Sequence, residues 1–342
     1  MMDSLPPTPA PLNVTINNQA RLIWSIAELL RGDFKQYECA DVILPLTVMK
    51  RLDSVLEPTH ALVREQHEQF KDKLDNLDPV LTRASGQKFY NTSRFTFSDI
   101  ARATKDHAMN LRAYIQGFSP NVRELFTEHF GFMTHVDRLD NANLLYRVLQ
   151  RFLTVDLSPE KVNNHEMGYV FEELIRRFNE QSNETAGEHF TPREVIRLMV
   201  NILFTGDEDA LKTPGVVRTV YDYDPTAGTG GMLSIAKEHV RQQISPTANI
   251  RLFGQELNPK SYAVCKSDLQ IIGEDDSQIR LGNSLTQDGH AERNFDYMLS
   301  NPPFGVDWKR IQKEFDAEHE GSGFDGRFGA GTPRVSDVSC WE

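Results

Sequence analysis

The feature that most constrains the fold of this chain is an alternation of strand-like and helical segments between residues 216 and 305. Residues 216–244 have the pattern of a strand, a glycine-rich turn and a helix, and residues 249–273 repeat the strand and the helix. A short third strand is expected within residues 277–285, and a fourth within residues 294–300, where Phe295, Tyr297 and Leu299 alternate with other residues. Strands and helices in units of this length predict a parallel, doubly wound, Rossmann-like α/β sheet.

The preceding residues predict a separate helical domain. Leu22, Ile26 and Leu29 recur at helical spacing, and residues 59–77 are charged enough to predict a solvent-exposed helix. Residues 86–97 are the least helical part of this region. We therefore expect a disordered Pro-rich tail over residues 1–13, a helical N-terminal domain over 14–157 and the α/β domain over 158–342.

The composition excludes several classes of protein. In 342 residues no apolar run approaches the roughly 18 residues that a membrane-spanning helix needs, and the first residues lack the basic and apolar parts of a signal peptide. Cys39, Cys265 and Cys340 are far apart and form no CxxC pair, so we expect a cytoplasmic protein without a metal site. The net charge of −12 argues against tight binding of a long phosphate backbone by this chain alone, although a basic cleft or a partner subunit could supply that binding.

The glycine-rich turn is the first candidate binding site. Asp224 stands where a strand ends, and Gly228, Gly230 and Gly231 open the turn into the next helix. Glycines there let the backbone approach a ligand and adopt positive φ. The spacing differs from the GxGxxG of dinucleotide enzymes, and no Lys-Ser/Thr pair follows as a phosphate loop requires. An acid at the head of the turn repels phosphate but suits a cation such as the α-ammonium of an amino acid.

Two further residues extend this candidate site. Glu256 ends the next predicted strand, where α/β folds that bind nucleosides place the acid that bonds ribose hydroxyls. Ribose together with an amino acid indicates S-adenosylmethionine, and Asn283 at the end of the third strand could bond the adenine of this donor. Each signal alone also fits a structural role, because glycine turns are common packing devices and a single strand-end Glu is usually solvated. All three at the carboxyl ends of successive strands favour a ligand site.

The segment Asn301-Pro302-Pro303-Phe304 follows the fourth strand and predicts a site for the amine that accepts the methyl group. An exocyclic amine on a base is a poor nucleophile, because its lone pair is delocalised into the ring. The Asn301 side-chain oxygen and the Pro302 carbonyl can accept its two N–H groups, while Phe304 stacks on a base flipped out of its duplex. The alternative is a turn that only ends a strand, but this tetrapeptide arises by chance in about one chain per thousand of this length.

Residues 191–203 have a complete helix start signal. Thr191 is expected to cap the helix, with Pro192 at its first position and Glu194 completing a capping box. Capping alone is sufficient to explain Thr191 and Pro192.

The segments GEHFTPREVIRLMV, YDPTAGTGGML, GQELNP, LGNSL and SNPPFG occur in this order, and with them the chain closely resembles the modification subunit of type I restriction–modification systems. Residues 22–56 are similar to the helical domain of that family, so the resemblance covers nearly the whole chain. It implies an adenine-N6 DNA methyltransferase that uses S-adenosylmethionine. The implied partners are DNA, a specificity subunit that reads the DNA, a restriction subunit and a second copy of the modification subunit.

Carried over residue by residue, the resemblance implies roles for two sets of residues. The donor pocket would be lined by Phe190, Thr191, Pro192, Asp224, Gly228, Gly230, Gly231, Glu256 and Asn283. The catalytic loop would consist of Asn301, Pro302, Pro303 and Phe304.

The end of the chain departs from the family pattern. Residues 318–337 are rich in glycine and polar residues and predict a long mobile loop, and the chain then ends in VSCWE without the apolar helix expected there. This resembles a truncation that removes the C-terminal strands, so we expect weak or no turnover by the isolated chain. Two alternatives stay open: methylation of protein glutamine or RNA, and an inactive assembly or DNA-binding module.

Overall fold

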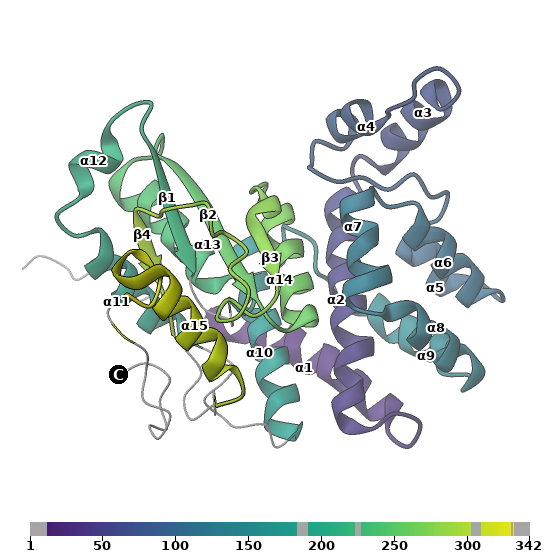
Figure 1. The fold of residues 1–342 in the computed structure, drawn as a ribbon. Coiled ribbons are helices and arrows are strands. Elements are labelled where there is room, and N and C mark those ends of the chain that lie inside the picture. The colour runs from purple at the N-terminus through teal and green to yellow at the C-terminus, as the bar shows by residue number, and fades with distance from the viewer. Residues whose placement is uncertain (1–11, 183–190, 223–226, 302–308, 330, 332–342) are drawn as a thin grey trace, which may run out of the picture. The chain divides into compact units, whose positions relative to one another are not determined.

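The computed structural model describes residues 12–182, 191–222, 227–301, 309–329 and 331, and the chain divides into two compact units (Figure 1). The first unit comprises residues 1–127 and 131–178, and the second comprises residues 128–130 and 179–342. The predicted tail lies outside the described residues except for Leu12 and Asn13, which begin the first helix. The boundary proposed between residues 157 and 158 stays a prediction.

In the described residues, the first unit is helical, as the sequence predicts. Its α-helices are α1 (Leu12–Leu30), α2 (Cys39–Leu56), α3 (His60–Phe70), α4 (Asp78–Ser85), α5 (Phe97–Arg102), α6 (His107–Gln116), α7 (Pro120–Glu124), α8 (Phe132–Asn141), α9 (Leu145–Leu153) and α10 (Asn164–Ser182). Short helical turns are η1 (Gln36–Glu38) and η2 (Leu125–His129). Pro45 lies inside α2, which continues through it, and Val63 is the buried residue of the charged helix α3.

A buried arginine organises the first unit. The Arg51 side chain is fully buried and donates to the carbonyl oxygens of Leu157 and Val162 and to Oδ1 of Asn164. These acceptors lie 106 to 113 residues further along the chain. Arg51 therefore attaches the start of α10 to α2 within this unit, because a guanidinium can donate to several acceptors at once.

The second unit contains a four-stranded parallel sheet in the order β3-β2-β1-β4. The strands are β1 (Val217–Asp222), β2 (Asn249–Glu256), β3 (Ile279–Leu281) and β4 (Tyr297–Leu299). Asp222 lies opposite Gly254 of β2 and Leu299 of β4, and Glu256 lies opposite Leu281 of β3. The four carboxyl ends therefore form one edge, and the chain order reverses between β1 and β4, where open α/β sheets bind ligands.

Helices cover one face of this sheet. The second unit contains α11 (Arg193–Phe204), α12 (Glu208–Lys212), α13 (Gly231–His239), η3 (Val240–Ile244), α14 (Pro259–Ile271), η4 (Asp276–Gln278), η5 (Lys309–Ile311), α15 (Gln312–Ser322) and η6 (Gly323–Asp325). α11 packs on α13, α13 packs on β1 and β2, and α14 packs on β2 and β3. Their core includes Ile196, Val200, Leu233, Leu252 and Leu269. Each such buried side chain stabilises the fold by about 1.5–3 kcal/mol.

An aromatic cluster lies on the opposite sheet face, because successive side chains of a strand point to opposite sides. Tyr221 stacks on Phe295 with ring centroids 4.3 Å apart, and Phe253 meets His290 edge-on at 5.5 Å. His290 is 5% exposed, and its Nε2 lies 3.3 Å from the carbonyl oxygen of Gly254. An imidazole thus fills a position in an otherwise apolar layer.

We expect His290 to make the second unit sensitive to acid. Burial is the main cause that lowers the pKa of His290. Because the folded-state pKa lies below the ordinary value of 6.5, His290 contributes full stability above that pH and loses it as the pH falls through the folded-state pKa. A His290→Gln variant should therefore lose less unfolding free energy than the wild type between about pH 7.5 and about pH 5.5 in denaturant titrations. Equal losses in the two proteins would contradict this.

The short strand β4 is held to β1 by side chains as well as by its ladder. The Asp296 carboxylate accepts hydrogen bonds from the Thr219 N–H at 2.8 Å and from the Thr219 hydroxyl at 2.9 Å, and the Asp296 N–H donates back to Thr219 Oγ1 at 2.9 Å. Although burial acts against the charge, these bonds and the nearby Arg218 lower the pKa of Asp296. Tyr297 also donates to Asp207. The strand that precedes Asn301 is therefore fixed in place.

The prediction of a mobile loop over residues 318–337 is wrong for its described part. Residues 318–322 belong to α15, and Gly323–Asp325 form a 3₁₀ turn. A Cβ at Gly329 would lie 2.3 Å from the Phe324 carbonyl oxygen, so glycine is required for this close turn. The glycines close a compact structure here, and residues 330 and 332–337 lie outside the described residues.

None of the described helices combines the length and the apolar character that crossing a membrane requires.

Candidate functional site

The glycine turn between β1 and α13 lies at the carboxyl edge of the sheet. Gly228 and Gly230 have φ values of 57° and 79°, in the left-handed region that favours glycine. A Cβ at Gly230 would also lie 2.7 Å from Sγ of Cys265 on α14. Conformation and space therefore both require glycine at residue 230, and α13 begins at Gly231 immediately after it.

Glu256 fastens this turn to the end of β2. Its carboxylate accepts the N–H of Gly228 at 2.7 Å and the N–H of Asn258 at 2.6 Å. The side chain is 2% exposed. A carboxylate offers about four lone-pair sites, so a group of this kind can accept hydrogen bonds from a ligand as well as from the backbone. The prediction that Glu256 ends the second strand is confirmed.

The Cys265 side chain packs against the glycine turn as a neutral thiol. It is fully buried, and burial raises its pKa well above the ordinary value, with the carboxylates of Asp268, Asp222 and Glu256 acting in the same direction. A thiol held neutral is a poor nucleophile. Cys265 therefore acts as a packing residue under Gly230.

Asn283 lies two residues beyond β3, in the loop that leads toward β4. Its side-chain Oδ1 accepts the N–H of Leu285 at 3.0 Å, which closes a turn in that loop. The preceding Gly282 donates its N–H to the carbonyl oxygen of Glu256 at 2.9 Å. Asn283 is thus attached to the same edge as Glu256, and its role toward a ligand stays a prediction.

Thr191 and Asn301 meet across 110 residues of sequence. The Asn301 Nδ2 donates to Thr191 Oγ1 at 2.7 Å. The expected capping by Thr191 is wrong, because Pro192 is the N-cap of α11, and no side-chain hydrogen bond caps that helix. The threonine hydroxyl is used instead to hold the carboxamide that follows β4. Because Nδ2 donates to Thr191, Oδ1 is the acceptor atom of this carboxamide.

Five of the predicted site residues lie outside the described part of the chain: Phe190, Asp224, Pro302, Pro303 and Phe304. Their roles stay predictions. The described ones lie at the ends of elements of the second unit or beside them: Thr191, Pro192, Gly228, Gly230, Gly231, Glu256, Asn283 and Asn301.

The sequence interpretation missed two supporting residues. Gln255 is 1% exposed and uses both ends of its carboxamide on the loop after β3: Nε2 donates to the carbonyl of Gln287, and Oε1 accepts the N–H of Gly289. Asn258 caps α14 by accepting the N–H groups of Lys260 and Ser261. The Asn-Pro pair before a helical pattern is a start signal that could have identified Asn258.

The chemistry of this edge is that of hydrogen bonding and charge. Among the described residues, no group of three or more His, Cys, Asp and Glu side chains could hold a metal ion. What the edge offers is a glycine turn, a buried carboxylate, a carboxamide fixed by a hydroxyl, and backbone N–H groups. Such groups suit the binding of a neutral or cationic organic ligand.

Comparison with known proteins gives matches along most of the chain. Residues 162–327 match the N-6 DNA Methylase family model, and residues 20–152 match the HsdM N-terminal domain model. The chain is 22% identical over 299 residues to the type I restriction enzyme MjaIX methylase subunit of Methanocaldococcus jannaschii, covering 82% of this chain and 50% of that protein. It is 29% identical over 206 residues to the EcoEI methylase subunit of Escherichia coli, covering 58% of this chain and 38% of that protein.

A solved structure has the same fold. The methyltransferase subunit of a type I restriction-modification system from Streptococcus thermophilus superposes with a TM-score of 0.61 at 21% sequence identity, covering 88% of this chain and 66% of that one. The chain spans half the length of its M. jannaschii relative and less of the E. coli one.

Proposed function

Because this chain belongs to the family of type I restriction–modification methylase subunits, we propose that it transfers a methyl group from S-adenosylmethionine to the N6 amine of a flipped adenine in DNA. The observation that carries this proposal is the hydrogen bond from Asn301 to Thr191. This bond holds a carboxamide after β4. The glycine turn after β1 and Glu256 at the end of β2 lie at the same sheet edge.

The donor would occupy the side of this edge formed by β1 and β2. Glu256, which also accepts the N–H groups of Gly228 and Asn258, would accept the ribose hydroxyls. The left-handed conformations of Gly228 and Gly230 would shape the turn beside the donor. Asp224 would pair with the α-ammonium, and Asn283 would bond the adenine. Phe190, Thr191 and Pro192 would line the remainder of the pocket. S-adenosylmethionine supplies an electrophilic methyl group on a sulfonium.

The acceptor base would occupy the side formed by β4. The Oδ1 of Asn301 and the carbonyl of Pro302 would accept the two N–H groups of the amine, so that its lone pair points at the methyl carbon. Pro303 would stiffen the loop, and Phe304 would stack on the base, which is worth about 1–3 kcal/mol. As the new C–N bond forms, the C–S bond breaks with its electron pair on sulfur, and the methylated nitrogen then releases one proton to water.

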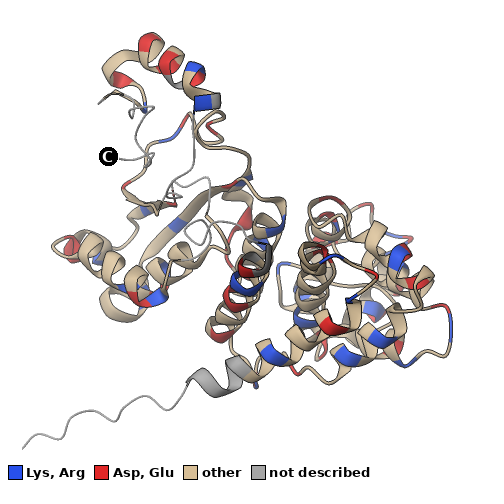
Figure 2. Cartoon of the chain, turned by 90° about the horizontal axis from the view of Figure 1, so that it is seen from below, with Lys and Arg blue, Asp and Glu red and all other residues tan. Residues whose placement is uncertain are grey.

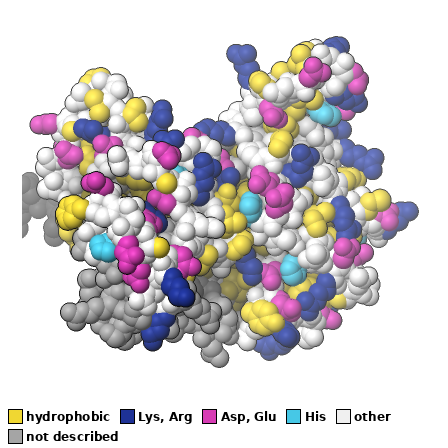
Figure 3. Space-filling model, in the orientation of Figure 1, with side chains coloured by type: hydrophobic (Ala, Val, Ile, Leu, Met, Phe, Trp, Pro, Cys, Tyr) yellow, Lys and Arg dark blue, Asp and Glu magenta, His cyan; other side chains and the backbone are white. Residues whose placement is uncertain are grey.

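The charge of the chain fits a function within a larger assembly. Residues 179–342 contain 16 Lys and Arg against 26 Asp and Glu. Acidic residues lie along α15 (Figure 2), and on the face in Figure 3 side chains of both signs are interspersed. Affinity for DNA depends on many basic contacts to phosphates. We therefore propose that a specificity subunit supplies much of the DNA binding, in a cytoplasmic complex with a restriction subunit and a second copy of this chain.

Replacing Thr191 with Val tests how Asn301 is positioned. The valine has nearly the same shape but cannot accept the Asn301 N–H, so we expect methyl transfer to slow by about tenfold, equivalent to about 1.4 kcal/mol. Thr191→Ser keeps the hydroxyl and should retain most of the rate. The measurement is single-turnover transfer at saturating donor, and an unchanged rate in Thr191→Val would remove this role.

The reaction itself can be tested with donor carrying a deuterated methyl group. The chain is incubated with this donor, DNA and a type I specificity subunit, and the DNA is digested to nucleosides for mass spectrometry. The expected product is N6-methyldeoxyadenosine with three deuterium atoms. Label in cytosine, in RNA or in protein glutamine would replace the proposal by the corresponding alternative. Absence of both donor binding and label in any product would favour the assembly module.

A further inference from the structure

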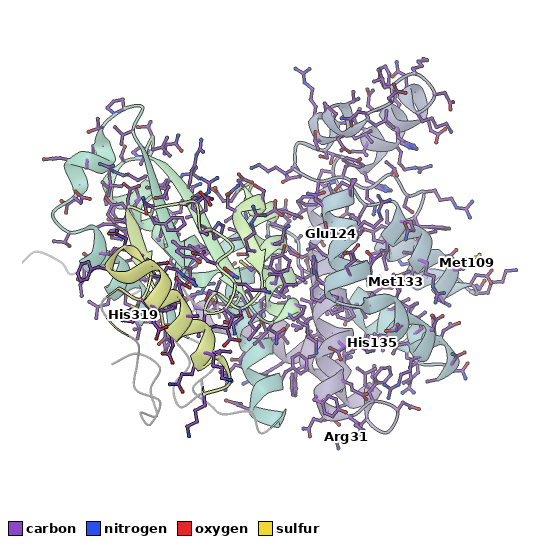
Figure 4. The ribbon with its side chains drawn as sticks, viewed as in Figure 1. Arg31, Met109, Glu124, Met133, His135 and His319 are labelled. Atoms are coloured by element: carbon purple, nitrogen blue, oxygen red, sulfur yellow. The ribbon has the colours of Figure 1, made fainter. Side chains whose placement is uncertain are left out.

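The segment that follows the catalytic loop folds back on itself. Arg327 donates from Nε at 2.8 Å and from Nη2 at 2.5 Å to the two carboxylate oxygens of Glu318, which lies on α15. His319 projects from the same helix (Figure 4), and its Nδ1 lies 2.7 Å from the carbonyl oxygen of Phe328. The hydrogen bond from Arg327 is the main cause that lowers the pKa of Glu318. α15 and the turn after it therefore form one connected unit.

The same arginine reaches a different part of the sheet edge. Its Nη1 donates to the carbonyl oxygen of Ser284, the residue after Asn283, and its Nε lies 3.6 Å from the Asp288 carboxylate. Both partners belong to the loop after β3. Gln255 fixes that loop to β2 by its bonds to Gln287 and Gly289.

Only an arginine can make all these contacts from one side chain. The guanidinium is a planar fork with five N–H donors, so it can bind a carboxylate with two donors and still donate a third bond elsewhere. A lysine has one nitrogen and cannot span Glu318 and Ser284 in this way. The side chain is 20% exposed, so water screens these contacts only in part.

We propose that Arg327 is a positioning residue that couples the segment after the catalytic loop to the donor-binding side of the edge. The inference depends on the proposed function, because Asn283, next to Ser284, is the predicted partner of the donor adenine. A donor bound there stabilises the loop after β3. Through Arg327 it also stabilises α15 and the turn that follows this helix. By thermodynamic reciprocity, docking of this segment also tightens donor binding.

The test uses S-adenosylhomocysteine and the full chain. Isothermal titration should show about a tenfold higher Kd for Arg327→Ala than for the wild type, with Arg327→Lys between them. Arg241→Ala is the matched control. Arg241 lies on η3 and also pairs with a carboxylate, that of Glu274. Its Kd should be unchanged.

Hydrogen exchange distinguishes coupling of α15 to the bound ligand from an effect of Arg327 on the stability of α15 alone. In the wild type, S-adenosylhomocysteine should slow exchange of amides in residues 312–329, and in Arg327→Ala this ligand-dependent protection should disappear. A residue that only stabilises α15 would change exchange equally with and without ligand. Equal Kd values together with unchanged protection would overturn the coupling and leave the proposed function intact. Failure of every variant to bind would overturn the donor assignment and the coupling together.

Discussion

Replacing Asn301 with Ala should lower the rate of methyl transfer by about 100- to 1,000-fold while leaving donor affinity nearly unchanged, which is the range for losing one oriented polar group that stabilises a transition state. The carboxamide lies after β4 and is held by Thr191, so it contacts the acceptor base in this account and not the donor. The measurement pairs single-turnover transfer with calorimetric titration of S-adenosylhomocysteine.

Two results would contradict this role for Asn301. Retained transfer in Asn301→Ala would show that another group orients the amine. An equal loss of donor affinity and rate would show that Asn301 belongs to the donor pocket. Asn301→Asp is a useful comparison, because it keeps an acceptor oxygen but loses the N–H that donates to Thr191, so its rate should lie between those of Ala and the wild type.

Replacing Glu256 with Ala should weaken donor binding by at least about 100-fold and destabilise the second unit. Two backbone N–H groups, of Gly228 and Asn258, lose their buried acceptor, and each unsatisfied group costs about 1–3 kcal/mol. The loss of the proposed ribose partner adds to the effect on donor binding. Calorimetry and denaturant unfolding measure the two effects separately.

Glu256→Gln distinguishes hydrogen bonding from charge. The glutamine keeps one carbonyl oxygen, so it should recover part of the stability but little of the donor affinity. Glu292→Gln changes an exposed acid of the same unit and serves as the control for charge. Donor affinity that survives in Glu256→Ala would place the ribose elsewhere.

The sheet could be predicted from the sequence because its signals are local. The apolar runs of β1 and β2 and the glycine turn between them identify a strand, a turn and a helix without any knowledge of the rest of the chain. The parallel order then follows from the lengths of the connections. Glu256 was found for the same reason, since its place at the end of β2 is a property of the local sequence.

The errors concern residues whose structure depends on distant partners. Thr191 has the local signal of a helix cap, but Asn301, 110 residues away, takes its hydroxyl. The glycines near Gly329 suggest mobility, but Arg327 also donates to the carbonyl oxygen of Ser284, 43 residues earlier, and this bond ties the segment to the loop after β3. No local pattern contains these contacts, because they form only when the sheet brings the segments together.

Donor and acceptor should meet at one sheet edge, and the position of bound S-adenosylhomocysteine tests this most directly. In a crystal structure of the complex, its sulfur should lie within about 8 Å of Asn301 Oδ1. This distance is the sum of the S–CH₃ bond, a separation of about 3–3.5 Å between the methyl carbon and the amine nitrogen, and the hydrogen bond from that nitrogen to Oδ1. A ligand bound elsewhere, such as the hollow lined by Arg197, Asn201 and His239 between α11 and α13, would contradict the account.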